Sequence, residues 1–440
     1  MSFRYDQITA IKMQIDNKKA IFGWSMYDWA NSAFATTIMA GFFPIFFKQY
    51  WSAGVDATVS TARLGMANSI AGIFVALFAP ILGAIADKGT AKKKFLMFFA
   101  YMGVVMTVSL YMVSKGNWTI AVVLYVFATI GFSGGNIFYD SLLTGIASKK
   151  KMDFVSALGF SLGYLGGGLL FALNVWMTLR PETFGFADAG EAVKFSFLCV
   201  GAWWAFFSIP LFVFVREPAS RDAVSGVSMV KAGFVQLKET FHQIRRLKPI
   251  FIFLMAYWLY MDGVDTIVRM AVDYGISIGF ESNELIVALL ITQFVGFPSA
   301  LGFGYLGGKI GARRSIFIAI GVYLFVSIWA GFIQNKIEFY ILAIIIGLVQ
   351  GGIQALSRSY YAKIIPVDKS AEYFGFYNML GKFATVIGPV FMGLIGLMVR
   401  HMGFSSNIAS RASIMSVSLF FIAGGILFYF VDEERNNEEI

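Results

Sequence analysis

Twelve apolar runs, each long enough to cross a lipid bilayer, constrain the fold of this chain more than any other feature. A membrane-spanning helix needs about 20 predominantly apolar residues. Because the bilayer core offers the backbone no hydrogen-bond partners, such runs must form helices rather than open strands. The sequence therefore predicts an all-α integral membrane protein with twelve transmembrane helices. We expect these helices at residues 20–47, 64–86, 95–113, 118–147, 154–179, 195–215, 250–274, 285–308, 316–333, 339–365, 373–399 and 412–431.

The charged residues support a membrane protein and argue against a nucleic-acid partner. Only 14% of the 440 residues are charged, whereas soluble domains carry about 25%. With the N-terminus placed inside, 24 of the 35 Lys and Arg residues fall in inner segments and 7 in outer loops. This positive-inside asymmetry predicts a multi-pass protein of the cell (inner or plasma) membrane with both termini in the cytoplasm. Topology thus accounts for the net charge of +9.

Two aspartates lie inside apolar runs in matching sequence frames. In each frame Trp comes four residues before Asp, an amide or acid comes three after it, and a hydroxyl residue follows. The frames are Trp24-x3-Asp28-x2-Asn31-Ser32 and Trp258-x3-Asp262-x2-Asp265-Thr266. Other echoes, such as Gly159-Phe160 and Gly375-Phe376, follow in the same order along the chain. The pattern predicts two six-helix pseudo-repeats of parallel topology, at residues 1–215 and 250–440.

A polar stretch at residues 216–249 separates the two sets of six runs. Its apolar side chains recur at intervals of three and four, at Val230, Phe234, Leu237, Phe241 and Ile244. This spacing predicts a cytoplasmic linker that contains an amphipathic helix at the membrane surface. A solvated linker without that helix is the alternative.

A glycine-rich basic pattern follows the second run and returns after the eighth. The first copy contains Gly83, Asp87 and Lys88, and the second contains Gly304, Gly308, Lys309, Arg313 and Arg314. The pattern resembles the signature of the major facilitator superfamily, which implies the major facilitator fold and a gating role for these loops. Asp87 could cap the N-terminus of the eleventh helix and latch the two halves together. Because Gly308 replaces the acid in the second copy, we expect no equivalent latch there.

Longer segments resemble a narrower family. These segments are Tyr27–Phe34, Gly351–Ser359, Glu372–Tyr377, Gly381-Lys382 and Gly388-Pro389. Together they resemble the vacuole-effluxer-like family of major facilitators, of which this chain looks like a bacterial-type member. The fungal members are autophagy-related proteins that export amino acids from the vacuole. The resemblance implies a secondary active transporter for an amino acid or a related small solute.

Polar side chains inside the apolar runs form the candidate site. A charged residue there costs on the order of 2.5–3.5 kcal/mol on insertion scales, so it is a functional candidate by default. Asp262, Asp265, Arg269 and Asp273 are spaced three, four and four apart, which predicts one polar stripe on the seventh helix, facing the bundle interior. The alternative role is interhelical contact, which contributes only about 0.6–2 kcal/mol. We expect substrate binding or coupling at Asp28, Asn31, Tyr27, Asp140, Trp258, Asp262, Asp265, Arg269, Arg358 and Lys382.

Charges of both signs on these helices favour a zwitterionic substrate such as an amino acid. Its carboxylate would meet Arg358 or Lys382, and its ammonium group would meet Asp28 or Asp262. Asp262 and Asp28 are also the candidates for proton coupling, which would accompany alternating access. The alternative is an exporter of cationic or amphipathic compounds, bound by the acids and aromatic side chains. Loss of the Arg358 charge would impair transport of a zwitterion but not export of a cationic or amphipathic compound.

Other classes of protein are disfavoured. The sequence has no Ser/His or Cys/His pattern typical of catalysis, and its single cysteine, Cys199, excludes an internal disulfide. His242 and His401 have no paired ligands at metal-binding spacing. We therefore expect a monomer that is not an enzyme and holds no cofactor or metal. Its expected partners are a small-molecule substrate, membrane lipid and protons.

Overall fold

The computed structural model describes residues 15–55, 57–89, 91–217, 235, 240 and 247–431. Within these residues, twelve helical segments are long and apolar enough to cross a membrane. The prediction of an all-α protein with twelve transmembrane helices is confirmed. The amphipathic helix predicted within 216–249 lies almost entirely outside the described residues.

The first six spans begin with an irregular one. Its α2 (Lys18–Ala33) continues through the π-helical η1 (Phe34–Phe42), α3 (Phe43–Phe46) and the π-helical η2 (Phe47–Trp51). The next five spans are built on α4 (Ala57–Gly89), α5 (Lys92–Ser109), α6 (Trp118–Leu142), α7 (Met152–Leu179) and α8 (Ala189–Phe214). Short 3-10 turns adjoin them at η3 (Leu110–Met112), η4 (Leu143–Gly145) and η5 (Pro181–Phe184).

The last six spans are more regular. They are α10 (Lys248–Ser277), α11 (Ser282–Ile310), α12 (Ala312–Ala330), α13 (Lys336–Ile364), α14 (Ser370–His401) and the pair α15 (Ser406–Ser416) and α16 (Ser418–Tyr429). The 3-10 turn η6 (Val367–Lys369) leads into α14. Asn335 and Ser405 each cap the N-terminus of the following helix, because their side chains accept hydrogen bonds from backbone N–H groups in its first turn.

The chain forms two compact units, and each includes a short segment from the other half of the sequence. The first unit comprises Met1–Ser148, Leu162–Val235 and Val367–Asn378. The second comprises Lys149–Ser161, Gln236–Pro366 and Met379–Ile440. The first turns of α7 therefore belong to the second unit, and the first turns of α14 belong to the first unit.

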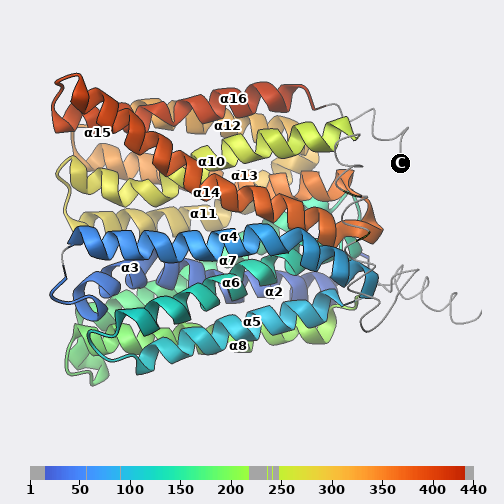
Figure 1. Cartoon of the computed structure of the whole chain (residues 1–440). Helices are drawn as coiled ribbons and strands as arrows, with labels where there is room; N and C mark the ends of the chain where they lie inside the picture. Colours follow the sequence, from blue (N-terminus) through green and yellow to red (C-terminus); the bar gives the residue numbers. More distant parts are fainter. Residues whose placement is uncertain are drawn as a thin grey trace, which may run out of the picture. The chain divides into compact units, whose positions relative to one another are not determined.

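Small residues allow close helix packing inside the first unit. A Cβ atom on Gly163 would lie 2.5 Å from the Ser32 hydroxyl, and one on Gly166 would lie 2.7 Å from the Trp29 ring. These glycines therefore bring α7 against α2, as small residues do between membrane helices. In the same unit α5 lies beside α6 and α8 (Figure 1).

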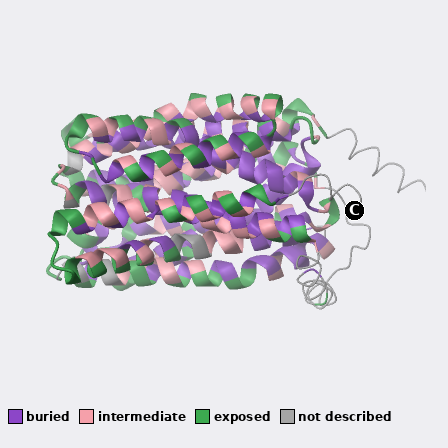
Figure 2. Ribbon diagram, turned by 90° about the horizontal axis from the view of Figure 1, so that it is seen from above, coloured by how far each residue is buried: buried purple, intermediate pink, exposed green. Residues whose placement is uncertain are grey.

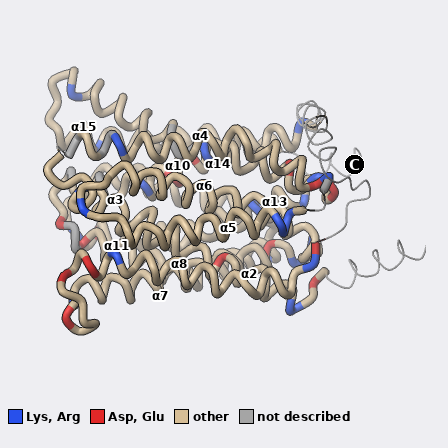
Figure 3. The backbone as a smooth tube through the Cα atoms, turned by 60° about the horizontal axis from the view of Figure 1, so that its bottom comes forward, with Lys and Arg blue, Asp and Glu red and all other residues tan. Residues whose placement is uncertain are grey.

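The distribution of charge and burial fits a lipid environment. Figure 3 shows that most of the Lys, Arg, Asp and Glu residues it colours lie near helix ends, with a few along the middle of the helices. Buried and exposed residues alternate along the same helices (Figure 2). Large apolar side chains such as Leu77, Phe206 and Leu397 are more than 60% exposed, as expected of a lipid-facing surface.

Candidate functional site

Asp28 is held by aromatic side chains in the first unit. The hydroxyl of Tyr139, on α6, donates a 2.7 Å hydrogen bond to Asp28 Oδ2. Trp24 Nε1 donates to the backbone oxygen of Tyr139 at 2.9 Å, and the two rings stack with centroids 4.5 Å apart. Trp24, four residues before Asp28 in the sequence frame, thus positions the residue that contacts the carboxylate. Asp28 itself is 8% exposed.

The other predicted residues of α2 also face α6. Asn31 Nδ2 donates to Asn136 Oδ1 at 2.7 Å. The Tyr27 ring lies 4.9 Å from the Tyr139 ring, and its hydroxyl occupies the space that a Cβ on Gly135 would take. Tyr27, Asp28 and Asn31 of α2 therefore all contact residues of α6. The α6 residues Tyr139 and Asn136 were missed, because no sequence pattern pairs them with α2.

Asp140 lies at the end of the same α6 segment, and it is buried. Asn378 Nδ2, from the α14 segment that belongs to this unit, lies 3.5 Å from Asp140 Oδ2. Asp28 accepts a hydrogen bond from the Tyr139 hydroxyl, whereas the Asn378 amide lies beside Asp140. Asp140 thus serves a different helix contact from that of Asp28.

Asp262 joins α10 to α14 in the second unit. Its Oδ1 accepts the backbone N–H of Gly388 at 2.8 Å and lies 3.4 Å from the Thr266 hydroxyl. Its Oδ2 is buried and has no hydrogen-bond partner among the residues that the structure describes. Gly388 is needed here because a Cβ would overlap Thr266 and lie 2.6 Å from Asp262 Oδ1. The carboxylate therefore sits at the Gly388-Pro389 step, where the proline cannot donate a backbone hydrogen bond.

Three more charges gather beside this position. Asp265 interacts electrostatically with Arg269, one turn along α10, and with Lys382 on α14. Arg269 is exposed, whereas Asp265 and Lys382 are half-buried. The predicted polar stripe on α10 therefore extends across to α14 and holds charges of both signs. Such an arrangement can bind a solute that itself carries both charges.

Other predicted residues of the second unit have different surroundings. Trp258 is half-buried, and its indole N–H is buried without a partner in the described part of the chain. Tyr260 exchanges a 2.7 Å hydrogen bond with Ser357 on α13. Arg358 is 3% exposed and donates from Nε and Nη2 to the Oγ and backbone oxygen of Ser156, both at 2.9 Å. Its guanidinium is thus engaged with the first turns of α7, apart from the group formed by Asp265, Arg269 and Lys382.

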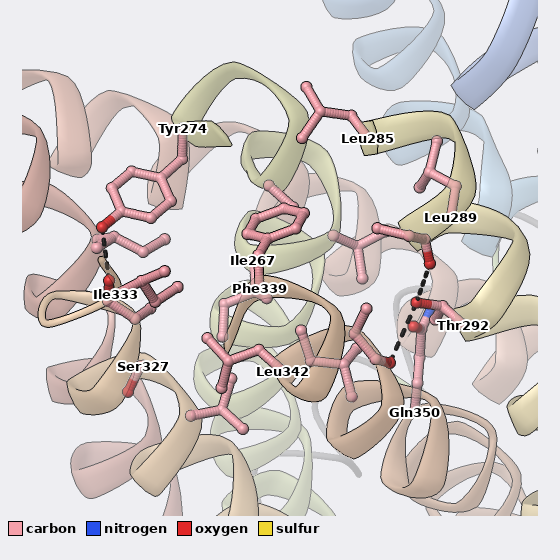
Figure 4. A pocket seen from close by; sticks show the side chains of 18 residues that line it. Ile267, Tyr274, Leu285, Leu289, Thr292, Ser327, Ile333, Phe339, Leu342 and Gln350 are labelled. Carbon is pink, nitrogen blue, oxygen red and sulfur yellow. Dashed lines mark hydrogen bonds between the residues drawn. The ribbon is translucent and has the colours of Figure 1, made fainter. Parts of the chain in front are cut away.

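An apolar cavity of about 80 Å³ lies within the second unit (Figure 4). It is lined from α10, α11, α12, α13 and α15, and no charged side chain contributes to its wall. Ile267 and Ala271 line it from α10, on the side of the helix away from Asp265 and Arg269. This cavity is therefore separate from the charged group and is unsuited to the charged part of a solute.

The first signature loop makes the predicted cap. Asp87 Oδ1 and Oδ2 accept the N–H groups of Ala371 and Glu372, in the first turn of α14, at 3.2 and 2.9 Å. Lys92 Nζ lies 2.8 Å from Asp87 and donates to the Ser370 hydroxyl at 2.7 Å. Gly83 permits this approach, because a Cβ there would overlap the backbone of Ala371. Lys88 is half-buried beside them.

Glu217, just after α8, extends this cluster and was missed by the sequence analysis. Its carboxylate accepts the backbone N–H groups of Lys92 and Lys93 at 2.7 and 3.2 Å, so it caps the N-terminus of α5. Burial raises the pKa of Glu217, and the hydrogen bonds from the two lysine N–H groups offset only part of that effect.

A pH dependence of stability follows from Glu217. Because its pKa is higher in the folded than in the unfolded chain, the folded state binds more protons, and this group's contribution to stability falls as pH rises above the unfolded value. We expect Glu217→Gln, which keeps an oxygen acceptor, to make the melting temperature of the purified protein less sensitive to pH, by about a few degrees, as the pH rises above the ordinary glutamate pKa of about 4.3. The exposed Glu182→Gln is the matched control. An unchanged pH dependence in Glu217→Gln would contradict the assignment.

The second signature loop is built differently. Lys309 stacks on the Tyr305 ring with Nζ 4.7 Å from its centroid, and Arg313 Nη2 donates to the backbone oxygen of Tyr429 at 2.6 Å. Arg314 is exposed. Gly304 packs against α7, because a Cβ there would lie 2.5 Å from Ala157 Cβ. At Gly308, where the first copy has its acid, a Cβ would meet nothing within 4 Å.

In the described residues, no group of three or more His, Cys, Asp or Glu side chains could hold a metal ion.

Comparison with known proteins identifies the family. The model of the family described as "Vacuole effluxer Atg22 like" matches residues 16–153 and 147–440. The chain belongs to this family of major facilitator transporters. It is 37% identical to an uncharacterized MFS-type transporter, YxiO, of Bacillus subtilis, over 94% of this chain and 95% of that protein. It is 22% identical to autophagy-related protein 22 of Saccharomyces cerevisiae, over 85% and 86% of the two chains.

Solved structures show the same fold at low sequence identity. The proton:xylose symporter XylE aligns with a TM-score of 0.70 at 11% identity, covering 98% of this chain and 97% of that one. The Escherichia coli fucose:proton symporter FucP aligns with a TM-score of 0.68 at 13% identity, covering 94% and 98%. As a member of the Atg22-like family, the chain is a multi-pass secondary transporter of the major facilitator superfamily.

Proposed function

We propose that this transporter moves a small zwitterion, of the amino-acid class, by alternating access coupled to protons. The observation that supports it best is the group formed by Asp265, Arg269 and Lys382, which places charges of both signs on α10 and α14. Charged side chains within membrane-spanning segments are costly, so three in one group indicate a ligand site or a transport pathway. Major facilitators bind their substrates near the midplane, where polar groups on such helices gather.

Each charge has a role in this proposal. Lys382 and Arg269 attract the substrate carboxylate, and Asp265 offsets the surplus positive charge when no substrate is bound. In the first unit, Asp28 can receive an ammonium group, assisted by the aromatic rings of Trp24, Tyr27 and Tyr139. Asp262 takes up the coupling proton on Oδ2, which has no hydrogen-bond partner in the described structure.

The proposal includes an orientation. Both ends of the chain lie in the cytoplasm, since most Lys and Arg residues fall in the segments that would share a side with the N-terminus if the spans alternate in direction. The bacterial relative supports a place in the plasma membrane. The protein works as a monomer, because one chain holds both sets of six helices.

A second function, the export of cationic or amphipathic compounds, is favoured by the surroundings of Asp28. Three aromatic side chains, Trp24, Tyr27 and Tyr139, lie beside this carboxylate, and such a group suits an organic cation. Transport of a zwitterion requires a carboxylate on the substrate, whereas export of an organic cation does not.

A ligand screen tests the proposed function. Purified protein is heated in the presence of amino acids, related zwitterions, their amides and decarboxylated amines, because a compound that binds the folded state raises the melting temperature. Compounds that stabilise the protein are then tested for counterflow in proteoliposomes. The proposal predicts stabilisation and counterflow by zwitterions and none by the matching amines. Stabilisation by the amines alone would support the second function and overturn the first.

A further inference from the structure

The cavity drawn in Figure 4 belongs to the second unit alone. Its wall comes from α10, α11, α12, α13 and α15, and every residue that lines it falls within that unit. Most of the lining side chains are apolar and buried: Ile267, Leu285 and Ile414 are each less than 5% exposed. The wall therefore suits the carbon skeleton of a guest molecule.

One polar atom of this wall has no partner. Gln350, on α13, is 9% exposed, and its side-chain oxygen Oε1 is buried without a hydrogen bond among the described residues. The other polar side chains of the wall are satisfied, because the hydroxyls of Tyr274, Thr292 and Ser327 donate to backbone oxygens at 2.5, 3.0 and 2.8 Å. An unpaired buried acceptor is unfavourable. The Gln350 oxygen therefore favours a guest that brings one hydrogen-bond donor.

Water fits this cavity poorly. A buried water usually makes about three hydrogen bonds, whereas the described side chains of the wall offer one unpaired acceptor. Apolar cavities of about 150 Å³ stay dry and bind small hydrocarbons such as benzene. The present cavity, of about 80 Å³, is smaller. It has room for about three or four non-hydrogen atoms, because one water molecule takes up about 30 Å³ of the liquid.

We infer that this cavity binds a small neutral alcohol, whose hydroxyl donates to Gln350 Oε1 and whose carbon chain lies against Ile267, Leu285 and Phe339. A charged guest is excluded, because no charged side chain lines the wall and burial of an unpaired ion is very costly. The hydroxyl distinguishes an alcohol from an apolar molecule of the same size, since one neutral hydrogen bond changes affinity by about two- to tenfold.

The site does not depend on the proposed transport function. Ile267 and Ala271 face the guest from α10, on the side of that helix away from Asp265 and Arg269. A bound alcohol thus fills the space between α10 and its neighbours α11 and α13. Because a filled cavity regains van der Waals contacts, we expect the alcohol to stabilise the second unit.

Methyl NMR on the full chain in lipid nanodiscs tests the site, with ¹³C labels on the isoleucine δ methyl groups. Ile267 and Ile414 line the cavity, whereas Ile318 and Ile422 of the same unit are exposed. We expect propan-1-ol to shift the Ile267 and Ile414 signals until they saturate. The signals of Ile318 and Ile422 should move only in proportion to the alcohol dissolved in the bilayer. Equal shifts without saturation at all four positions would overturn the inference.

Comparison with 1-chloropropane tests the role of Gln350. This compound has as many non-hydrogen atoms as propan-1-ol but no hydrogen-bond donor. The saturation midpoint for 1-chloropropane divided by that for propan-1-ol should fall by about two- to tenfold in Gln350→Met, which keeps an unbranched side chain and removes the amide. This ratio is compared between variants in the same lipid, so partition of the compounds into the bilayer cancels.

Gln354→Met is the matched control for Gln350→Met. It removes an amide from the next turn of α13 that does not line the cavity, so the ratio of midpoints should stay as in the parent. An unchanged ratio in Gln350→Met, or an equal fall in Gln354→Met, would contradict the hydrogen bond to Gln350.

A larger side chain in the wall tests the location of the guest. Ala288 lines the cavity from α11 and is 5% exposed, so Ala288→Leu should occupy the space and abolish the saturable shifts with both compounds. Gly302→Leu adds bulk to the same helix at an exposed position where a Cβ would meet nothing within 4 Å, and it should bind as the parent does. Saturable shifts that survive in Ala288→Leu would place the guest elsewhere and overturn the inference. If Ala288→Leu does not fold, the comparison of Gln350→Met with Gln354→Met decides the question.

Discussion

Asp262→Asn is expected to abolish uptake driven by a pH gradient while leaving substrate counterflow in place. The asparagine keeps an oxygen that can accept the N–H of Gly388, so the contact between α10 and α14 persists. What the variant loses is the proton site at Oδ2, which is buried without a partner among the described residues. A transporter that binds substrate but no proton exchanges substrate across the membrane without accumulating it. Proteoliposomes with and without an imposed pH gradient measure both activities.

Asp28→Asn is the matched comparison, because Asp28 occupies the same place in the other sequence frame. Its partner is the Tyr139 hydroxyl rather than a backbone N–H, and aromatic rings surround it. We expect this variant to raise KM while accumulation at saturating substrate still follows the pH gradient. Proton-driven accumulation that survives Asp262→Asn would contradict the role of Asp262 in coupling, whatever the substrate is.

The helices and the repeat could be predicted from the sequence because both depend on local patterns. An apolar run of 20 residues has no alternative to a helix in lipid, and the twelve predicted runs correspond to twelve observed spans. The capping role of Asp87 was also predictable, since its loop pattern is specific and a helix N-terminus requires an acceptor. The grouping of Asp262, Asp265 and Arg269 followed from helical spacing alone.

The partners of these residues could not be predicted, because they come from helices remote in sequence. Tyr139 and Gly388 carry no signal that pairs them with Asp28 and Asp262. Arg358 was expected near the substrate on the ground of its helix, but the structure engages its guanidinium with Ser156.

Lys382→Met is expected to weaken binding of a zwitterion by on the order of ten- to a hundredfold. A hydrogen bond to a charged group contributes about 1.5–3 kcal/mol, and each 1.4 kcal/mol is a factor of ten in affinity. Without Lys382, Arg269 is the remaining cation that interacts with Asp265, so the group becomes less positive. Transport of a cationic compound should be unchanged or improved by the same variant. The dissociation constant is measured by titration calorimetry, and the rate by counterflow.

The double variant Asp265→Asn with Lys382→Met separates loss of a binding charge from disruption of the charged group. It restores the balance of charge on α10 and α14 but supplies no cation for the substrate carboxylate. We therefore expect its zwitterion affinity to remain as low as that of Lys382→Met, while its melting temperature recovers. Lys336→Met, which removes a lysine whose side chain is 61% exposed, controls for the general effect of losing a positive charge. If the double variant regains full zwitterion affinity, Lys382 acts through Asp265 and does not bind the substrate carboxylate.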